Sequence, residues 1–79
     1  MRQHAFEALH QAFWQQFEQE LGKLEQKRQL STQTIAEFGP HYRTLCHHLA
    51  LANSRNYSAG LCRSLQSLVD RAHRQIYQR

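Results

Sequence analysis

Histidine and cysteine are the residues of this sequence whose side chains could bind a metal or take part in catalysis. The 79 residues include six His and two Cys, and Cys46, His47 and His48 are consecutive. Zinc needs three or four nitrogen, sulfur or carboxylate ligands that converge on one point. Three consecutive residues of a helix fan out over roughly 200° of its circumference, so at most two of them face a common centre. We therefore expect buried thiols and surface imidazoles in place of a metal site.

A metal site could also be built from Cys46, Cys62 and a third group such as His73, if the fold brought these segments together. The two cysteines lie sixteen positions apart, which matches neither a zinc motif nor a disulfide scaffold. A nucleophilic triad would need an orienting group and an oxyanion hole around a pocket, and a chain this short has a thin core. We predict no catalytic, cofactor-binding or metal-binding residue and no enzymatic activity.

Arginine gives a second chemical signal, because its distribution along the chain is uneven. Residues 1–40 hold four Lys or Arg against five Glu, whereas residues 41–79 hold six Arg against Asp70 alone. A basic half indicates contact with nucleic acid, an anionic membrane surface or an acidic partner. The residues that we predict to make this contact are Arg43, Arg55, Arg63, Arg71, His73 and Arg74. A hydrogen-bonded structural role is equally open to His73.

Helices must position these side chains, because apolar residues recur every three or four positions over most of the chain. The first helix is predicted over about residues 3–28. Its apolar stripe consists of Phe6, Leu9, Phe13, Phe17, Leu21 and Leu24. Trp14 lies beside this stripe, so we expect it at an edge of the core, with its indole N–H near water or a backbone acceptor.

The region from Ser31 to Ala52 has two helical interpretations. Ser31 is a good N-cap and opens a short helix over residues 33–38, after which Gly39 and Pro40 interrupt the pattern. Since proline suits the first turn of a helix, we start the second long helix near Pro40; a single helix kinked there is the alternative. Both pieces present one apolar face, made of Ile35, Phe38, Tyr42, Leu45, Leu49 and Ala52.

A third helix is predicted after a break at residues 53–57, with Ser58 as its N-cap. Its apolar stripe consists of Leu61, Leu65, Leu68, Val69, Ala72 and Ile76. Amphipathic helices joined by short connections bury their stripes most simply as a bundle. We therefore predict an all-α, antiparallel three-helix bundle with a short extra helix or a kink before helix 2, forming one domain over residues 1–79.

The third helix reaches Arg79 without a Gly, Pro or Asn to end it, as though a longer protein had been cut there. No uninterrupted apolar run in the sequence approaches the roughly 20 residues that span a bilayer. Arginine accumulates toward this end, and Lys and Arg accumulate on the cytoplasmic side of membrane-spanning helices. A membrane segment after residue 79 would therefore place these arginines near anionic headgroups.

The segment over residues 42–52, with the sequence YRTLCHHLALA, carries a resemblance to a known family. Further matches are Arg55, Tyr57-Ser58, Leu68-Val69, Arg71-Ala72-His73 and Tyr77, together with Phe6, Trp14 and Leu24-Glu25. With these residues the chain resembles the soluble N-terminal region of the stage II sporulation protein M family of multi-pass bacterial membrane proteins. The chain departs from the family's pattern at His48, where an acidic residue is expected, and at Ala59, where proline often stands.

The resemblance implies a non-enzymatic interaction or scaffold domain on the cytoplasmic side of the bacterial inner membrane. Its partners would be proteins of a membrane-associated complex, and its membrane attachment would follow residue 79. Formation of a homo-oligomer is a further option. The alternative from composition is a small basic helical domain that binds nucleic acid. Against that alternative, the arginines are spread along the third helix and do not gather at its N-terminal end, as a DNA-reading helix would require.

Overall fold

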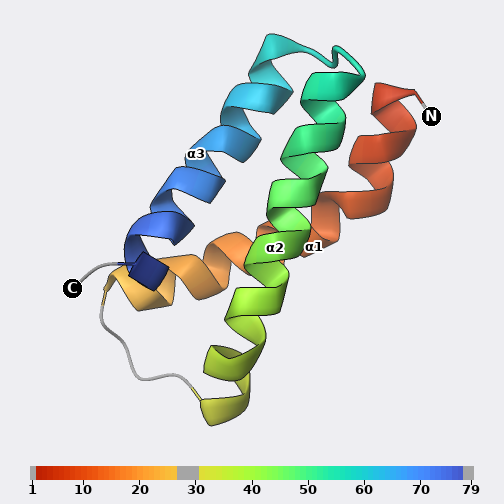
Figure 1. The fold of residues 1–79 in the computed structure, drawn as a ribbon. Helices are drawn as coiled ribbons and strands as arrows, with labels where there is room; N and C mark the ends of the chain where they lie inside the picture. Colours follow the sequence, from red (N-terminus) through yellow and green to blue (C-terminus); the bar gives the residue numbers. More distant parts are fainter. Residues whose placement is uncertain (1, 27–30, 78–79) are drawn as a thin grey trace.

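Three α-helices make up the described part of the chain, which covers residues 2–26 and 31–77 of a computed structural model. They are α1 (Gln3–Glu25), α2 (Thr32–Ser54) and α3 (Ala59–Tyr77). Consecutive helices run in opposite directions, α2 and α3 share the largest interface, and α1 crosses behind α2 (Figure 1). The predicted antiparallel three-helix bundle is confirmed. The predicted helical residues 27–28 and 78–79 lie outside the described part.

The face that α1 turns toward the core differs from the predicted stripe. Its buried residues are Phe6, Trp14, Phe17 and Leu21. Leu9 is 63% exposed and Phe13 is half-buried, so the prediction for Leu9 is wrong. Trp14 is buried and does not lie at an edge of the core. Both faces satisfy the helical period, but an indole ring buries much more apolar area than a leucine side chain, which favours the face that contains Trp14.

A single helix runs through Gly39 and Pro40, so residues 33–38 belong to α2 and the predicted helix start near Pro40 is wrong. The hydroxyl of Ser31 accepts a hydrogen bond from Thr34 N at 3.1 Å, which confirms the predicted N-cap. Two residues before the proline, the ring of Phe38 stacks on Phe17 of α1, with centroids 4.9 Å apart. These two attachments hold the first turns of α2 in line, although proline removes one backbone hydrogen bond from the helix interior.

The structure has the predicted break between α2 and α3, but it covers residues 55–58 and not 53–57, because Asn53 and Ser54 still belong to α2. Asn56 takes the left-handed conformation, with φ of 55°. The N–H of Tyr57 donates to the Ala52 carbonyl and that of Asn56 to the Asn53 carbonyl, which is the Schellman pattern of a helix C-terminus. Ser58 then caps α3 by accepting from Leu61 N at 3.3 Å, as predicted.

Apolar side chains of α2 and α3 complete the core. They are Phe38, Leu45, Leu49 and Ala52 from α2 and Leu61, Leu65, Leu68 and Ala72 from α3. Two residues predicted for the core lie outside it, since Ile35 is 57% and Ile76 is 37% exposed. Both lie at the end of the bundle where α2 begins and α3 ends (Figure 1).

Candidate interaction surface

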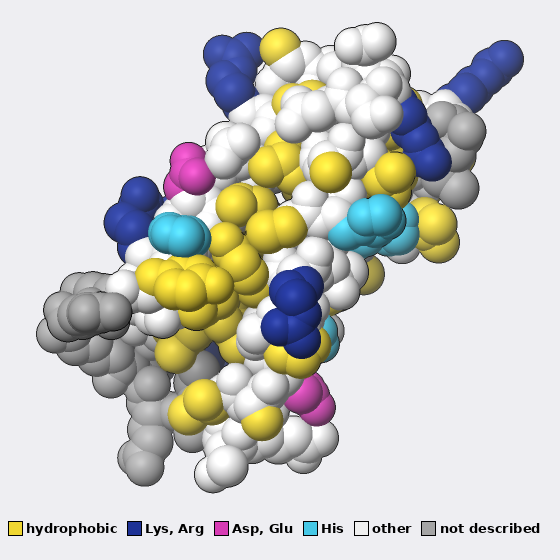
Figure 2. All heavy atoms as spheres, viewed as in Figure 1, with side chains coloured by type: hydrophobic (Ala, Val, Ile, Leu, Met, Phe, Trp, Pro, Cys, Tyr) yellow, Lys and Arg dark blue, Asp and Glu magenta, His cyan; other side chains and the backbone are white. Residues whose placement is uncertain are grey.

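The six residues predicted to contact a partner lie on α3, on α2 or just after α2, but the fold does not gather them into one patch. Arg55 and Arg63 belong to the end of the bundle where α2 meets α3, whereas His73 and Arg74 belong to the last turns of α3. Figure 2 shows the basic side chains as separate groups at the margins of the face that α2 and α3 form. These six side chains are therefore spread along α2 and α3 and do not form one basic surface.

Arg71 is committed to contacts inside the molecule. Its Nε and Nη2 atoms donate to the two carboxylate oxygens of Glu25 at 2.9 and 2.7 Å, and its Nη1 atom lies 3.4 Å from Glu18 Oε2. The hydrogen bond from Arg71 lowers the pKa of Glu25, and the same bond raises the pKa of Arg71. A bidentate pair of this kind fixes geometry as well as charge, so Arg71 ties α3 to the end of α1.

The other arginines have weaker contacts. The guanidinium carbon of Arg55 lies 6.0 Å from the centroid of the Phe6 ring, at the outer limit of a cation–π contact. Arg63 Nε donates to the Ala59 carbonyl within its own helix at 3.4 Å. Within residues 2–26 and 31–77, Arg43 and Arg74 form no ion pair. These two side chains carry the basic charge that remains available on α2 and on the last turns of α3.

His73 combines an internal hydrogen bond with exposure. Its Nδ1 atom lies 3.2 Å from the hydroxyl of Tyr42, and its ring lies against that of Tyr77, with centroids 4.5 Å apart. Burial, and then a hydrogen bond with Cys46, raises the pKa of Tyr42 to about 12. Tyr42 therefore keeps its proton at neutral pH and can donate it in a hydrogen bond to His73.

Exposed apolar side chains gather at the end of the bundle where α3 ends. Among the described residues, four large hydrophobic side chains are exposed, and only Leu9 lies elsewhere; the other three are Ile35, Ile76 and Tyr77. A cavity of about 260 Å³ opens beside Ile35 and Ile76, and its other lining residues are Leu24, Phe38, Gly39 and Gln75. Tyr77 lines a neighbouring hollow with His73, Arg74 and Gln75. We call Ile35, Ile76, Tyr77 and this cavity the end surface.

Hydrophobic side chains also extend from this end along the junction of α2 and α3, where they form a yellow band between the basic groups (Figure 2). Isolated apolar residues are normal on a protein surface, whereas a contiguous patch bordered by polar groups is typical of a binding site. Arginine and tyrosine beside such a patch are the residue types enriched at interaction hot spots. The arrangement is suited to binding another apolar surface.

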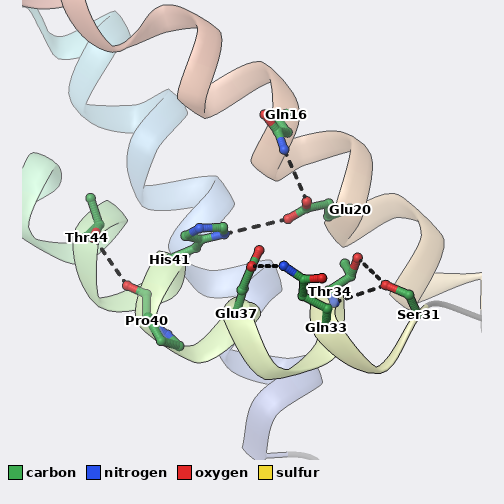
Figure 3. A network of polar contacts seen from close by, with 9 residues as sticks. All are labelled: Gln16, Glu20, Ser31, Gln33, Thr34, Glu37, Pro40, His41 and Thr44. Carbon is green, nitrogen blue, oxygen red and sulfur yellow. Dashed lines mark hydrogen bonds and ion pairs between the residues drawn. The ribbon is translucent and has the colours of Figure 1, made fainter.

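A polar network borders the interface of α1 with α2 (Figure 3). Gln16 Nε2 donates to Glu20 Oε2 at 3.5 Å, and His41 Nδ1 lies 3.8 Å from Glu20 Oε1. On α2, Gln33 Nε2 donates to Glu37 Oε1 at 3.0 Å. The one contact of these that joins the two helices, between His41 and Glu20, is long, and such partly exposed pairs contribute little to stability. This network therefore adds little to the attachment of α1 to α2.

The structure contains a hydrogen bond between two buried rings, Trp14 and His48, that was not predicted from the sequence. Trp14 Nε1 donates to His48 Nδ1 at 2.9 Å, and His48 is 5% exposed. This contact corrects two expectations, since the indole has a side-chain acceptor and His48 is not a surface imidazole. A signal was present in the sequence: His48 lies between Leu45 and Ala52 at the same three-four spacing as the core residues of α2.

The residues considered for a metal site are not brought together. No group of three or more His, Cys, Asp or Glu within residues 2–26 and 31–77 could hold a metal ion. Cys46 and Cys62 are both free thiols, and the Sγ atom of Cys62 lies 3.7 Å from the carbonyl of Tyr57.

Comparison of the sequence with known proteins gives one match, to a protein family. None of the three described helices is long and apolar enough to cross a membrane. No curated protein and no solved structure matches the chain. A family profile with the description "Domain of unknown function (DUF8413)" matches residues 4–78, which is nearly the whole sequence. The chain therefore belongs to the DUF8413 family.

Proposed function

We propose that this chain is a non-enzymatic interaction domain that binds a protein partner through its end surface. The observation that carries the proposal is the position of Ile35, Ile76 and Tyr77, three exposed large hydrophobic residues at one end of a bundle whose core is otherwise buried. Leaving them in water costs roughly 25 cal/mol for each Å² of apolar area. A partner that covered them would recover that free energy.

The wider setting that we propose is the cytoplasmic part of an integral membrane protein similar to stage II sporulation protein M. The resemblance over residues 42–77 and the basic side chains of Arg43 and Arg74 support this setting. If so, the reading frame of the native gene continues beyond codon 79 into apolar segments of about 20 residues each. A reading frame without such segments would refute the proposed membrane setting, but it would not affect the proposal that the end surface binds a partner.

Nucleic-acid binding is not favoured by the positions of the arginines. Arg71, which lies between the other basic residues of α3, is neutralised by Glu25 and Glu18. Arg55 and Arg63 are separated from Arg74 along the length of the bundle. A phosphate backbone is best matched by a continuous basic stripe, and the visible face has none (Figure 2).

Two aspartates placed in the end surface should release the partner. We expect the double variant Ile35→Asp/Ile76→Asp to weaken the complex at least about tenfold, because both apolar contacts are replaced by charges that must be desolvated. Both positions are exposed, so the fold should tolerate the change. The measurement is the size of the detergent-solubilised complex of the full-length protein from its native host, determined by sedimentation.

The matched control is Leu9→Asp, because Leu9 is also exposed but lies on α1, away from the end surface. This variant should sediment like the wild type. If the double variant and the control both keep the size of the wild-type complex, the end surface is not the binding site.

A further inference from the structure

The hydrogen bond between Trp14 and His48 requires one ring nitrogen of His48 to be free of a proton. It joins α1 to α2 over 2.9 Å, in a place where His48 is almost completely covered. An indole nitrogen can only donate, so Nδ1 of His48 must accept, and the neutral ring carries its hydrogen on Nε2. A proton on Nδ1 would place the N–H of His48 against the indole N–H of Trp14, and the hydrogen bond would be lost.

The surroundings of His48 oppose a positive charge. The ring of His10 on α1 lies against it, with centroids 4.0 Å apart, and His47 is its neighbour on α2. Arg55, at the end of α2, lies near Phe6, whose ring also contacts His48. Within the described residues, no carboxylate contacts His48, and α3 presents no ionisable side chain to it. Burial, and then the charges of His10 and His47, lower the pKa of His48 to about 4.

The other attachments of α1 differ in their response to acid. Its C-terminal end is held by the ion pair of Glu25 with Arg71, and the lowered pKa of Glu25 keeps that pair charged in weak acid. The interface of α2 with α3 is the largest of the three, and all of its buried side chains apart from His48 are apolar. The N-terminal half of α1 is held by two hydrogen bonds between Gln3 and Ser58, by the buried ring of Phe6 and by the Trp14–His48 hydrogen bond, and of these only the last requires a neutral imidazole.

We propose that Trp14, His48 and His10 form an acid-operated latch between α1 and α2. Proton uptake by His48 detaches the N-terminal half of α1 and exposes the apolar surface beneath it, while Arg71 holds the other half in place. In the closed state the site stays neutral down to about pH 4, whereas a solvated imidazole protonates near pH 6.5. The open state therefore binds more protons in this window, so the closed state loses stability as the pH falls through it.

The single tryptophan of the sequence makes the latch measurable in the 79-residue chain. Between pH 7 and pH 4.5 we expect the opening constant of α1 to rise on the order of 50-fold. Tryptophan emission should change over the same range, because the indole N–H loses its acceptor. Hydrogen exchange, corrected for its intrinsic pH dependence, should accelerate first in residues 4–16 and later in α2 and α3. Equal acceleration in all three helices would mean global unfolding and would overturn the proposal.

Three variants separate the latch from a general effect of acid. His48→Asn keeps an acceptor near the position of Nδ1 but takes up no proton, so its emission and exchange should be flat over this range. His10→Gln removes a charge that opposes protonation of His48 in the closed state, so the rise in the opening constant between pH 7 and pH 4.5 should be smaller than in the wild type. His73→Gln, the control, removes an exposed imidazole of α3 and should behave as the wild type. Wild-type pH dependence in both the His48→Asn and His10→Gln variants would refute the latch.

Discussion

Replacing Phe17 with alanine should lower the free energy of unfolding by about 4 kcal/mol. Phe17 is 1% exposed, and its ring stacks on Phe38 at 4.9 Å with an angle of 15° between the planes. This pair is the main aromatic contact between the second half of α1 and the first turns of α2. A chain of this size has roughly 4–12 kcal/mol of total stability, so the variant should be close to unfolding at room temperature.

Urea denaturation followed by circular dichroism measures this loss. The matched control is Leu9→Ala on the same helix, which removes an exposed side chain and should change the stability by less than about 0.5 kcal/mol. If Phe17→Ala is no less stable than Leu9→Ala, the buried face of α1 has been assigned incorrectly.

Replacing Pro40 with alanine should raise the free energy of unfolding by about 2 kcal/mol. Proline in a helix interior costs roughly 3 kcal/mol relative to alanine, and part of this cost is offset because proline also restricts the unfolded chain. Pro40 lies eight residues after the first residue of α2 and is exposed, so an alanine there loses no buried contact. The new N–H can donate to the carbonyl of Ala36, four residues earlier.

The control for this variant is Pro40→Gly, which restores the N–H but keeps a poor helix former. Its gain in stability should be smaller by about 1 kcal/mol. Thermal and urea unfolding of the three proteins provide the comparison. A loss of stability in Pro40→Ala would show that α2 needs the proline, and that the helix is not continuous through residue 40.

The helices and their ends could be predicted from the sequence because the responsible interactions are local. Apolar spacing defines the helical segments, and Ser31, Asn56 and Ser58 form their caps and turn from backbone preferences that depend on neighbouring residues alone. The continuity of α2 could not be predicted in this way. Proline is as compatible with the start of a helix as with a tolerated interior position, and the outcome depends on the packing of Phe38 against α1.

The faces of the helices and the contacts of the candidate site depend on tertiary packing. In α1, Phe13 and Trp14 are adjacent, so either of two overlapping apolar faces could be buried. The position of α2 decides that the face with Trp14 is buried and that Leu9 is exposed. Arg71 meets Glu25 only because α1 crosses the end of α3, and no spacing in the sequence indicates that crossing. Ile35 and Ile76 follow the apolar pattern of their helices, but they lie beyond the neighbouring turns and become the end surface.

Site-specific photo-cross-linking of the full-length protein in its native cells tests the central claim most directly. A photoreactive amino acid is placed in turn at Ile35, Ile76 and Leu9, three exposed positions of which only the first two belong to the end surface. The account predicts that positions 35 and 76 cross-link to the same protein, that position 9 does not, and that an aspartate at position 35 abolishes the cross-link from 76. Equal cross-linking from all three positions, or none from 35 and 76, would contradict it.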